Sequence, residues 1–107
     1  MAVDTAEVVL GGRGSEEHVV PTRFIVRSGG AVVFRTVDNR VHTITFEPDS
    51  LGPEALEFLT RTGQLRSPPL VSEGTIYRIS LEGAPPGYYP FLAEGPGPPV
   101  LGELFVE

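Results

Sequence analysis

Two histidines, His18 and His42, are the side chains of this chain whose chemistry could include metal binding or proton transfer. His42 follows a turn at Asp38–Asn39 and begins an alternating run, so we expect it at one end of a β-structure. His18 ends a glutamate-rich loop, where we expect it on the surface. A lone histidine in either place is more often packed or solvent-facing than a metal ligand, and both interpretations stay open at this point.

A catalytic serine site would need a nucleophile, a base and an orienting acid in one place. Ser15, His18 and several carboxylates supply these residue types, but Ser15 is not part of a nucleophile-elbow motif. The pair Glu16–Glu17 is of a kind that is common on acidic surfaces. We therefore expect no enzymatic activity.

The composition argues against several classes of function. The 107 residues contain no cysteine, which removes disulfides, thiolate nucleophiles, iron–sulfur clusters and thiolate metal sites. A net charge of −6 and a pI near 4.8 argue against nucleic acid, whose phosphates need a basic surface. We find no apolar run long enough for a membrane span, and the first ten residues do not have the pattern of a signal peptide.

Alternating apolar and polar residues predict about seven short strands in a single domain, residues 1–107. The run AEVVL ends at Gly11–Gly12, and the stretch 22–37 contains two strands that we expect to form a hairpin at Ser28–Gly30. Pro90 places YYPFLA at a sheet edge, or leaves the donor side of that strand unpaired. This arrangement is typical of an all-β sandwich.

One segment departs from the strand pattern. In GPEALEFLTRTGQL, Pro53 stands at a first helical position and Gly63 at a stop, which predicts a short helix within an insertion at about residues 50–66. Its apolar stripe would comprise Ala55, Leu56 and Leu59. We expect the helix to cap one side of the sandwich, and a docking role through Phe58 is the alternative.

Residues 8–49, VVLGGRGSEEHVVPTRFIVRSGGAVVFRTVDNRVHTITFEPD, resemble the first half of a plastocyanin-type cupredoxin, a family of blue-copper proteins. The shared features are a strand ending in glycine, Val20–Pro21 before RFIV, Gly29, and then Asn39 and His42 before TITF. Residues 80–107 resemble the closing part of the family, with its G-x-Y-x-F segment, its ligand loop and a last strand after glycine. The resemblance implies a Greek-key β-sandwich of seven or eight strands.

In that family a histidine, a cysteine, a second histidine and usually a methionine hold copper. The resemblance places His42 at the first ligand position, Ala93 at the cysteine, Pro96 at the second histidine, and Leu101 or Val100 at the methionine. Copper is the cofactor that the family implies, but three of its four ligands are absent. We expect a loop without metal, EGPGPPVL, that proline restricts and whose apolar side chains fill the former pocket.

These features predict a non-enzymatic cupredoxin-like domain without a type 1 copper site, which serves as a protein-binding or structural module. Its partner would be another protein. The contact surface would lie at the ligand-loop end and comprise Gly12, His42, Pro96, Pro98, Pro99 and Val100. The alternative is that this end only caps the domain. The resemblance suggests an extracytoplasmic location.

The alternative function is the binding or handling of copper or zinc. In the family the loop after the first strand points toward the copper end, so the resemblance would bring His18 near His42. Glu17 or Glu94 could then complete a site for Zn²⁺ or Cu²⁺. A metal titration with a His42→Ala control separates the two functions, because only metal handling predicts a stabilisation that the variant loses.

Overall fold

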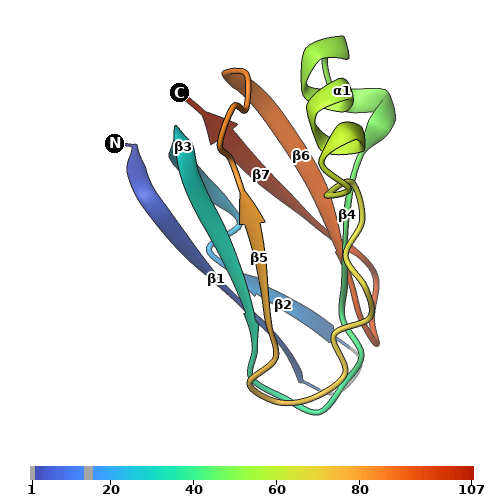
Figure 1. The fold of residues 1–107 in the computed structure, drawn as a ribbon. Coiled ribbons are helices and arrows are strands. Elements are labelled where there is room, and N and C mark those ends of the chain that lie inside the picture. Colours follow the sequence, from blue (N-terminus) through green and yellow to red (C-terminus); the bar gives the residue numbers. More distant parts are fainter. Residues whose placement is uncertain (1, 14–15) are drawn as a thin grey trace.

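The computed structural model describes residues 2–13 and 16–107. These residues form seven strands and one α-helix, which are joined by turns and loops (Figure 1). The strands are β1 (Val3–Arg13), β2 (Glu16–Val20), β3 (Arg23–Thr36), β4 (Thr43–Phe46), β5 (Ile76–Ser80), β6 (Gly87–Glu94) and β7 (Val100–Val106). Between β4 and β5 lie a 3₁₀ turn, η1 (Pro48–Ser50), and the helix α1 (Pro53–Arg61). The expected number of strands and the inserted helix are confirmed.

Two layers of strands face each other across the core, and β3 belongs to both. The hydrogen-bonded order is β2-β1-β3-β7-β6-β4, and β5 pairs with β3 outside this path. The segment Arg23–Val26 of β3 pairs in parallel with β7. The later segment Ala31–Arg35 pairs in parallel with β1 and antiparallel with β5. The architecture is the Greek-key β-sandwich that the sequence led us to expect.

The hairpin expected at Ser28–Gly30 is wrong, because the chain continues through these residues as one long strand, β3. Gly29 has a φ of +94°, a backbone conformation that glycine tolerates best. A Cβ on Gly30 would lie 2.1 Å from the backbone oxygen of Asp4. The two glycines therefore mark the place where β3 crosses from one layer to the other, and β1 approaches it there too closely for a side chain.

The first strand is also longer than expected. β1 does not end at Gly11–Gly12 but runs to Arg13 and forms a hairpin with β2. Gly11 lies under Val37, whose Cγ2 would be 2.9 Å from an added Cβ. A Cβ on Gly12 would lie 2.7 Å from the backbone oxygen of Glu16. These glycines are strand residues at points of close approach, which explains why their sequence looked like the start of a loop.

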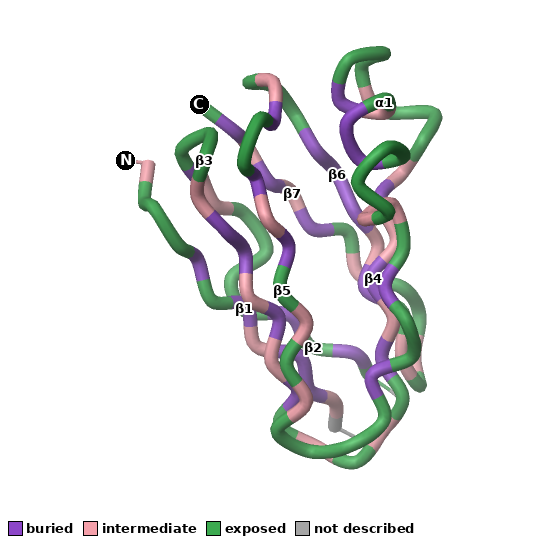
Figure 2. The backbone as a smooth tube through the Cα atoms, in the orientation of Figure 1, coloured by how far each residue is buried: buried purple, intermediate pink, exposed green. Residues whose placement is uncertain are grey.

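The core confirms the alternation read from the sequence, since buried and more exposed residues alternate along the inner strands (Figure 2). Phe91 lies at its centre, with its ring centroid 5.4 Å from that of Phe34 and 5.8 Å from that of Phe46. Gly102 makes room for this ring, because a Cβ there would lie 2.1 Å from Phe91 Cζ. Edge-to-face aromatic contacts of this kind add to the burial of apolar area.

The strand that contains Pro90 is not at an edge, because β6 lies between β4 and β7. The last residue pair between β4 and β6 is Phe46–Phe91, and Pro90 lies one residue beyond it. The backbone carbonyl of Pro90 accepts a hydrogen bond from the N–H of Glu47 at 3.0 Å. The missing N–H of proline therefore falls where the ladder with β4 has ended. This position fits the second of the two interpretations, a strand whose donor side is unpaired.

The helix α1 lies beside one end of β4 and β6 and covers the core there (Figure 1). Ala55, Phe58 and Leu59 are buried, whereas Leu56 is only partly buried. The docking role considered for Phe58 is therefore wrong, since its side chain is part of the core. Gly63 ends the helical segment with a φ of +70°, as its position predicted. Neither α1 nor η1, the described helices, is long enough to cross a membrane.

The outer margin of β5 carries a side chain in place of a neighbouring strand. Ser80 donates its N–H to Gln64 Oε1 at 2.7 Å and accepts a hydrogen bond from Gln64 Nε2 at 3.0 Å. The amide of Gln64 thus binds both backbone groups of one residue, as a paired strand would.

Candidate functional site

Two segments, β2 and the turn after β3, place a carboxylate on each side of His42. In β2, Glu17 and Val19 point into the sandwich, while Glu16 and His18 point out, because side chains alternate along a strand. Asp38 lies in the turn after β3, where its Oδ1 accepts the backbone N–H of Arg40 at 3.1 Å.

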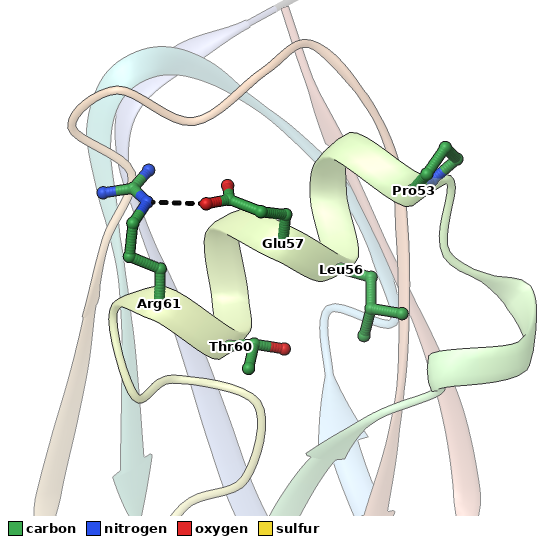
Figure 3. A pocket seen from close by; sticks show the side chains of 5 residues that line it. All are labelled: Pro53, Leu56, Glu57, Thr60 and Arg61. Carbon is green, nitrogen blue, oxygen red and sulfur yellow. Dashed lines mark hydrogen bonds and ion pairs between the residues drawn. The ribbon is translucent and has the colours of Figure 1, made fainter.

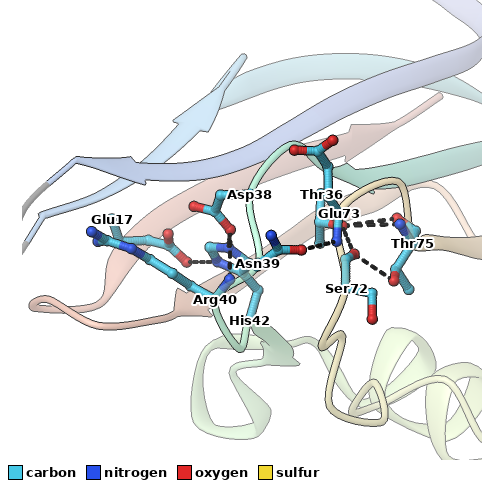
Figure 4. Close-up of polar contacts among 9 residues, drawn as sticks. All are labelled: Glu17, Thr36, Asp38, Asn39, Arg40, His42, Ser72, Glu73 and Thr75. Atoms are coloured by element: carbon cyan, nitrogen blue, oxygen red, sulfur yellow. Dashed lines mark hydrogen bonds and ion pairs between the residues drawn. The ribbon is translucent and has the colours of Figure 1, made fainter.

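The backbone of His42 is fixed by an isolated bridge to the segment before β5. Its N–H and carbonyl both bind Leu70, at 3.0 Å and 2.8 Å. The side chain can therefore move little, and it points into the space between the β2 strand and the turn that carries Asp38 (Figure 4).

The imidazole of His42 is bound on both nitrogens. Nδ1 lies 2.7 Å from Glu17 Oε2, and Nε2 lies 2.7 Å from Asp38 Oδ1 (Figure 4). The side chains of His42 and Glu17 are fully buried, and that of Asp38 is 20% exposed. We call these three residues the ion triplet.

The geometry of the ion triplet favours a protonated imidazole. A neutral imidazole carries one N–H and could donate to one carboxylate only, leaving a lone pair facing the other at 2.7 Å. Burial opposes the charged form and is the largest influence on the pKa of His42, but the hydrogen bonds and charges of Asp38 and Glu17 together outweigh it and raise that pKa above its usual value. The raised pKa and the two short contacts both favour an imidazolium that donates to the two carboxylates.

Asp38 responds in the opposite direction. Burial disfavours its charged form, yet the hydrogen bonds from His42 and from the backbone N–H of Arg40, with the charges of both residues, lower the pKa of the carboxyl group. Glu17 Oε1 and Asp38 Oδ2 have no hydrogen-bond partner within the described part of the chain.

The loop between β6 and β7 rests against the ion triplet. A Cβ on Gly95 would lie 2.5 Å from Glu17 Oε2 and 2.9 Å from Glu17 Oε1. Only a residue without a side chain fits against this carboxylate. Glu17 therefore contacts both His42 and the loop, and it is the residue at this end that the sequence interpretation undervalued. The alternation along β2 could have identified it, because the apolar Val19 stands two residues after Glu17 and therefore on the same, inward face.

The positions matched to copper ligands do not form a metal site. Ala93 is fully buried and is paired with Ile44 and Val100. Pro96 is exposed. Both nitrogens of His42 are taken by carboxylates, so copper does not fit the residues that the chain presents here.

Leu101 does not fill a former pocket, because it is 51% exposed. Its neighbour Val100 packs against the core and is the residue of the two that points inward. The expectation of an apolar filling thus holds for Ala93 and Val100 and is wrong for Leu101.

The two histidines do not come together. His18 lies on the outward face of β2, where its Nε2 is 3.3 Å from Glu16 Oε2 and its side chain is 54% exposed. Glu17, the next residue in the strand, faces the other way. Glu94 is exposed, and Ser15 lies outside the described residues. Among the residues that are described, no group of three histidine or carboxylate side chains is arranged to hold a metal ion.

The residues of the expected contact surface differ in exposure. Pro96, Pro98 and Pro99 are exposed, and Gly12 and Val100 are partly buried. His42 is fully buried, so its inclusion is wrong. The sequence interpretation missed three exposed apolar residues near this end, which are Val37, Val41 and Val71.

A surface depression of about 400 Å³ lies elsewhere, on the outer side of α1 (Figure 3). Leu56 and Pro53 line it together with the ion pair between Arg61 Nε and Glu57 Oε1, which are 3.0 Å apart. Both ionic side chains are mostly exposed. No buried polar group points into this depression from the residues that line it, so it offers no basis for specific chemistry.

No protein-family model matches the chain, and no curated protein sequence is similar to it. Solved structures are similar in fold. The oxidised plastocyanin of Dryopteris crassirhizoma is 21% identical, with 95% of this chain and 100% of that chain covered and a TM-score of 0.68. A purple cupredoxin from Nitrosopumilus maritimus is 16% identical, with 95% and 99% covered and a TM-score of 0.64.

The copper-containing nitrite reductase of Thermus scotoductus is 19% identical to the chain, with a TM-score of 0.62. The match covers 95% of this chain but only 22% of the reductase, so the chain spans about a fifth of that enzyme. These identities establish a common architecture. Since the chain contains no cysteine, it cannot supply the thiolate of a type 1 centre. The chain has the β-sandwich fold of the cupredoxins, without the cysteine ligand of a type 1 copper site.

Proposed function

We propose that this domain is a non-enzymatic binding module that contacts another protein through its loop end. We define the loop end as residues 37–42, 70–74 and 95–99, which lie together at the lower end of the sandwich in Figure 1. The proposal is supported by what this end exposes and by how firmly its loops are held.

The observation that carries the proposal is a pair of exposed valines. Val41 and Val71 adjoin the antiparallel bridge between His42 and Leu70, so they stand opposite one another, and each is 54% exposed. Val37 is 42% exposed in the same loop. These are three of the eight large apolar side chains that the described residues expose. Apolar side chains grouped in this way suit a protein contact.

The loops that carry these valines are held by buried polar contacts. The ion triplet ties the 37–42 loop to β2. Thr36 Oγ1 donates to the carbonyl of Ser72 at 2.6 Å, and the N–H of Glu73 donates to Asn39 Oδ1 at 3.2 Å (Figure 4). A surface whose loops are already ordered loses little conformational entropy on binding.

No specific observation favours the alternative of metal handling. It required His18 and His42 to face one another, and they lie on opposite sides of the β2 strand. The proposal that the domain is not an enzyme is supported by the surroundings of His42. Its two nitrogens are bound by carboxylates, so this imidazole has no free lone pair to activate a nucleophile.

Site-specific crosslinking tests the proposal directly. A photoreactive amino acid is placed at Val41 in cells of the native source, and at Ile76 in β5 as a control of similar exposure, 60%, outside the loop end. We expect a discrete crosslinked protein from position 41 and not from position 76. The affinity of that purified protein should then fall at least about tenfold in Val41→Asp and remain unchanged in Ile76→Asp.

The opposite pattern would count against the loop end. If position 76 gives the discrete product, the contact surface lies on β5. If Val41→Asp folds normally and binds the crosslinked protein as tightly as the unchanged chain does, the crosslink reports proximity and the loop end only caps the domain.

A further inference from the structure

We propose that the carboxylate of Glu17 occupies the place beside His42 that a metal ion would need, so that an internal ion triplet joins the segments of this end and excludes cations from it. The inference does not depend on the proposed protein contact, because it concerns buried groups. It goes beyond the absence of copper ligands, since it assigns to Glu17 the role of occupying the space beside His42.

The first step concerns the donor atoms. A histidine binds a metal through a ring nitrogen that carries a free lone pair. In this chain both ring nitrogens of His42 face carboxylate oxygens at 2.7 Å, within hydrogen-bond distance. A cation would have to break one of these two contacts, and the contact with Glu17 lies between fully buried side chains.

The second step concerns space. The donor atoms of a tetrahedral zinc ion lie about 3.3 Å apart, because each is about 2 Å from the metal, so His42 Nδ1 and Glu17 Oε2, at 2.7 Å, would have to separate before both could bind one. The carboxylate of Glu17 cannot retreat toward the loop, because Gly95 already lies so close that even a methyl group would collide with both of its oxygens. Glu17 is thus wedged between His42 and Gly95.

The third step concerns what the ion triplet joins. Glu17 belongs to β2, Asp38 and His42 to the 37–42 loop, and Gly95 to the loop between β6 and β7. A metal ion with ligands on separate segments ties them into one unit. Here His42 takes the place of the cation. Glu17 connects it to β2, to which Glu17 belongs, and to the β6–β7 loop, against which the carboxylate lies.

The charged groups that face His42 come from β2 and from the 37–42 loop. Glu17 faces it from β2 and Asp38 from the preceding turn, while the charge of Arg40 acts on Asp38 from the same loop. Within the described residues the carboxylate of Glu17 is hydrogen-bonded to His42 through Oε2, and its Oε1 has no hydrogen-bond partner. Truncation of Glu17 should therefore leave a small space beside the imidazole of His42, which a free carboxylate can enter.

A first experiment uses the unchanged protein and follows the imidazole groups by nuclear magnetic resonance. We expect two ring N–H signals from His42 at neutral pH and no change in them when Zn²⁺ is added at micromolar concentration. His18, which is exposed, serves as the internal control and should respond first. Loss of the His42 N–H signals on addition of Zn²⁺ would show that cations reach the site and would overturn the proposal.

A second experiment uses Glu17→Ala, with Glu16→Ala as the matched control on the exposed face of the same strand. We expect the melting temperature of Glu17→Ala to fall by roughly ten degrees or more, and that of Glu16→Ala to stay within a few degrees. Sodium acetate should raise the melting temperature of Glu17→Ala alone, because acetate can re-enter beside His42. Sodium chloride at the same ionic strength is the control for salt.

Two results of the second experiment would contradict the proposal. Equal melting temperatures for Glu17→Ala and Glu16→Ala would show that Glu17 does not join the segments. A Zn²⁺-dependent stabilisation of the unchanged protein that His42→Gln abolishes would show that Glu17 does not exclude cations. If Glu17→Ala does not fold, Glu17→Gln replaces it, and its His42 ring should then lose one of the two N–H signals near neutral pH.

Discussion

Two histidine–carboxylate pairs begin from neighbouring residues of β2 and differ in almost every physical respect. The outer pair joins Glu16 and His18 at 3.3 Å, and both side chains are more than half exposed. The inner pair joins Glu17 and His42 at 2.7 Å, and both side chains are fully buried. The residue types are the same, so the difference comes from the face of the strand on which each glutamate lies.

The comparison shows that burial decides what such a pair contributes. An exposed ion pair contributes about 0–1 kcal/mol, because water screens the charges and the side chains lose freedom. In a buried pair the removal of one partner costs about 3–5 kcal/mol, since the other charge is left without compensation in a medium of low dielectric constant. One residue of displacement along a strand therefore separates a surface contact from a structural requirement.

The largest expected effect is that of His42→Ala. The substitution leaves Glu17 fully buried, and Asp38 largely buried, without the positive charge between them. We expect a loss of about 3–5 kcal/mol in the free energy of unfolding, measured by denaturant titration. The matched variant His18→Ala should change it by no more than about 0.5 kcal/mol. Similar losses in the two variants would remove the distinction between the inner and the outer pair.

A smaller effect is expected for Gly95→Ala, which acts on the inner pair from the loop. The new methyl group would collide with the carboxylate of Glu17, and such overpacking costs about 1–3 kcal/mol. In the double variant Glu17→Ala/Gly95→Ala the collision partner is gone, so the two losses should not add. Gly52→Ala is the control, because its Cβ would meet nothing within 4 Å. Strict additivity would mean that Gly95 does not act through Glu17.

The pH dependence of stability is the third test. The pKa of His42 is raised in the folded state, so its contribution is complete below the unfolded value of 6.5 and is lost as the pH rises through the folded pKa. The pKa of Asp38 is lowered, so its contribution is complete above 3.8 and is lost as the pH falls through the folded pKa. We expect the contribution of these two groups to be greatest between these values, and each should change stability by at most about 1.4 kcal/mol per pH unit.

Unfolding titrations at a series of pH values measure this dependence, and His42→Ala provides the reference. Subtraction of its profile from that of the unchanged protein should leave a decline on the alkaline side. The variant His18→Ala should retain that decline. A difference profile that rises with pH would mean that His42 is neutral in the folded protein.

The smallest effect concerns the outer pair itself. Glu16→Gln removes the charge that faces His18, and we expect a change of about 0.5 kcal/mol or less in the free energy of unfolding. That change should vanish in high salt, because the pair is exposed to screening ions. The inner pair should keep its contribution under the same conditions. A salt-independent loss in Glu16→Gln would show that the outer pair is more than a surface contact.

The sequence was sufficient to predict the buried faces of several strands. The alternation of Ile44 and Phe46 with the threonines between them, and of Ile79 with Arg78, appears in the structure as buried and less buried positions. Pro53 and Gly63 limited the helix because their backbone preferences act locally. Features that depend on neighbouring residues in the chain were therefore predictable.

Features that depend on contacts between distant segments were not. Ser28–Gly30 has the composition of a turn, yet β1 and β7 pair with β3 on either side and keep it extended. Phe58 instead of Leu56 enters the core because of the way α1 lies on the sheet. The importance of Glu17 depends on two contacts between distant segments. Asp38 binds the other nitrogen of His42, and Gly95 lies against the carboxylate of Glu17. No local sequence pattern contains this arrangement of three segments.

The side-chain amide of Gln64, bound to both backbone groups of Ser80, has a consequence for the behaviour of the protein in concentrated solution. A strand from another molecule that approached the free margin of β5 would find these groups already satisfied. Exposed margins of sheets are the places where chains associate into aggregates and fibres. A single glutamine thus shortens the template on which such growth could begin.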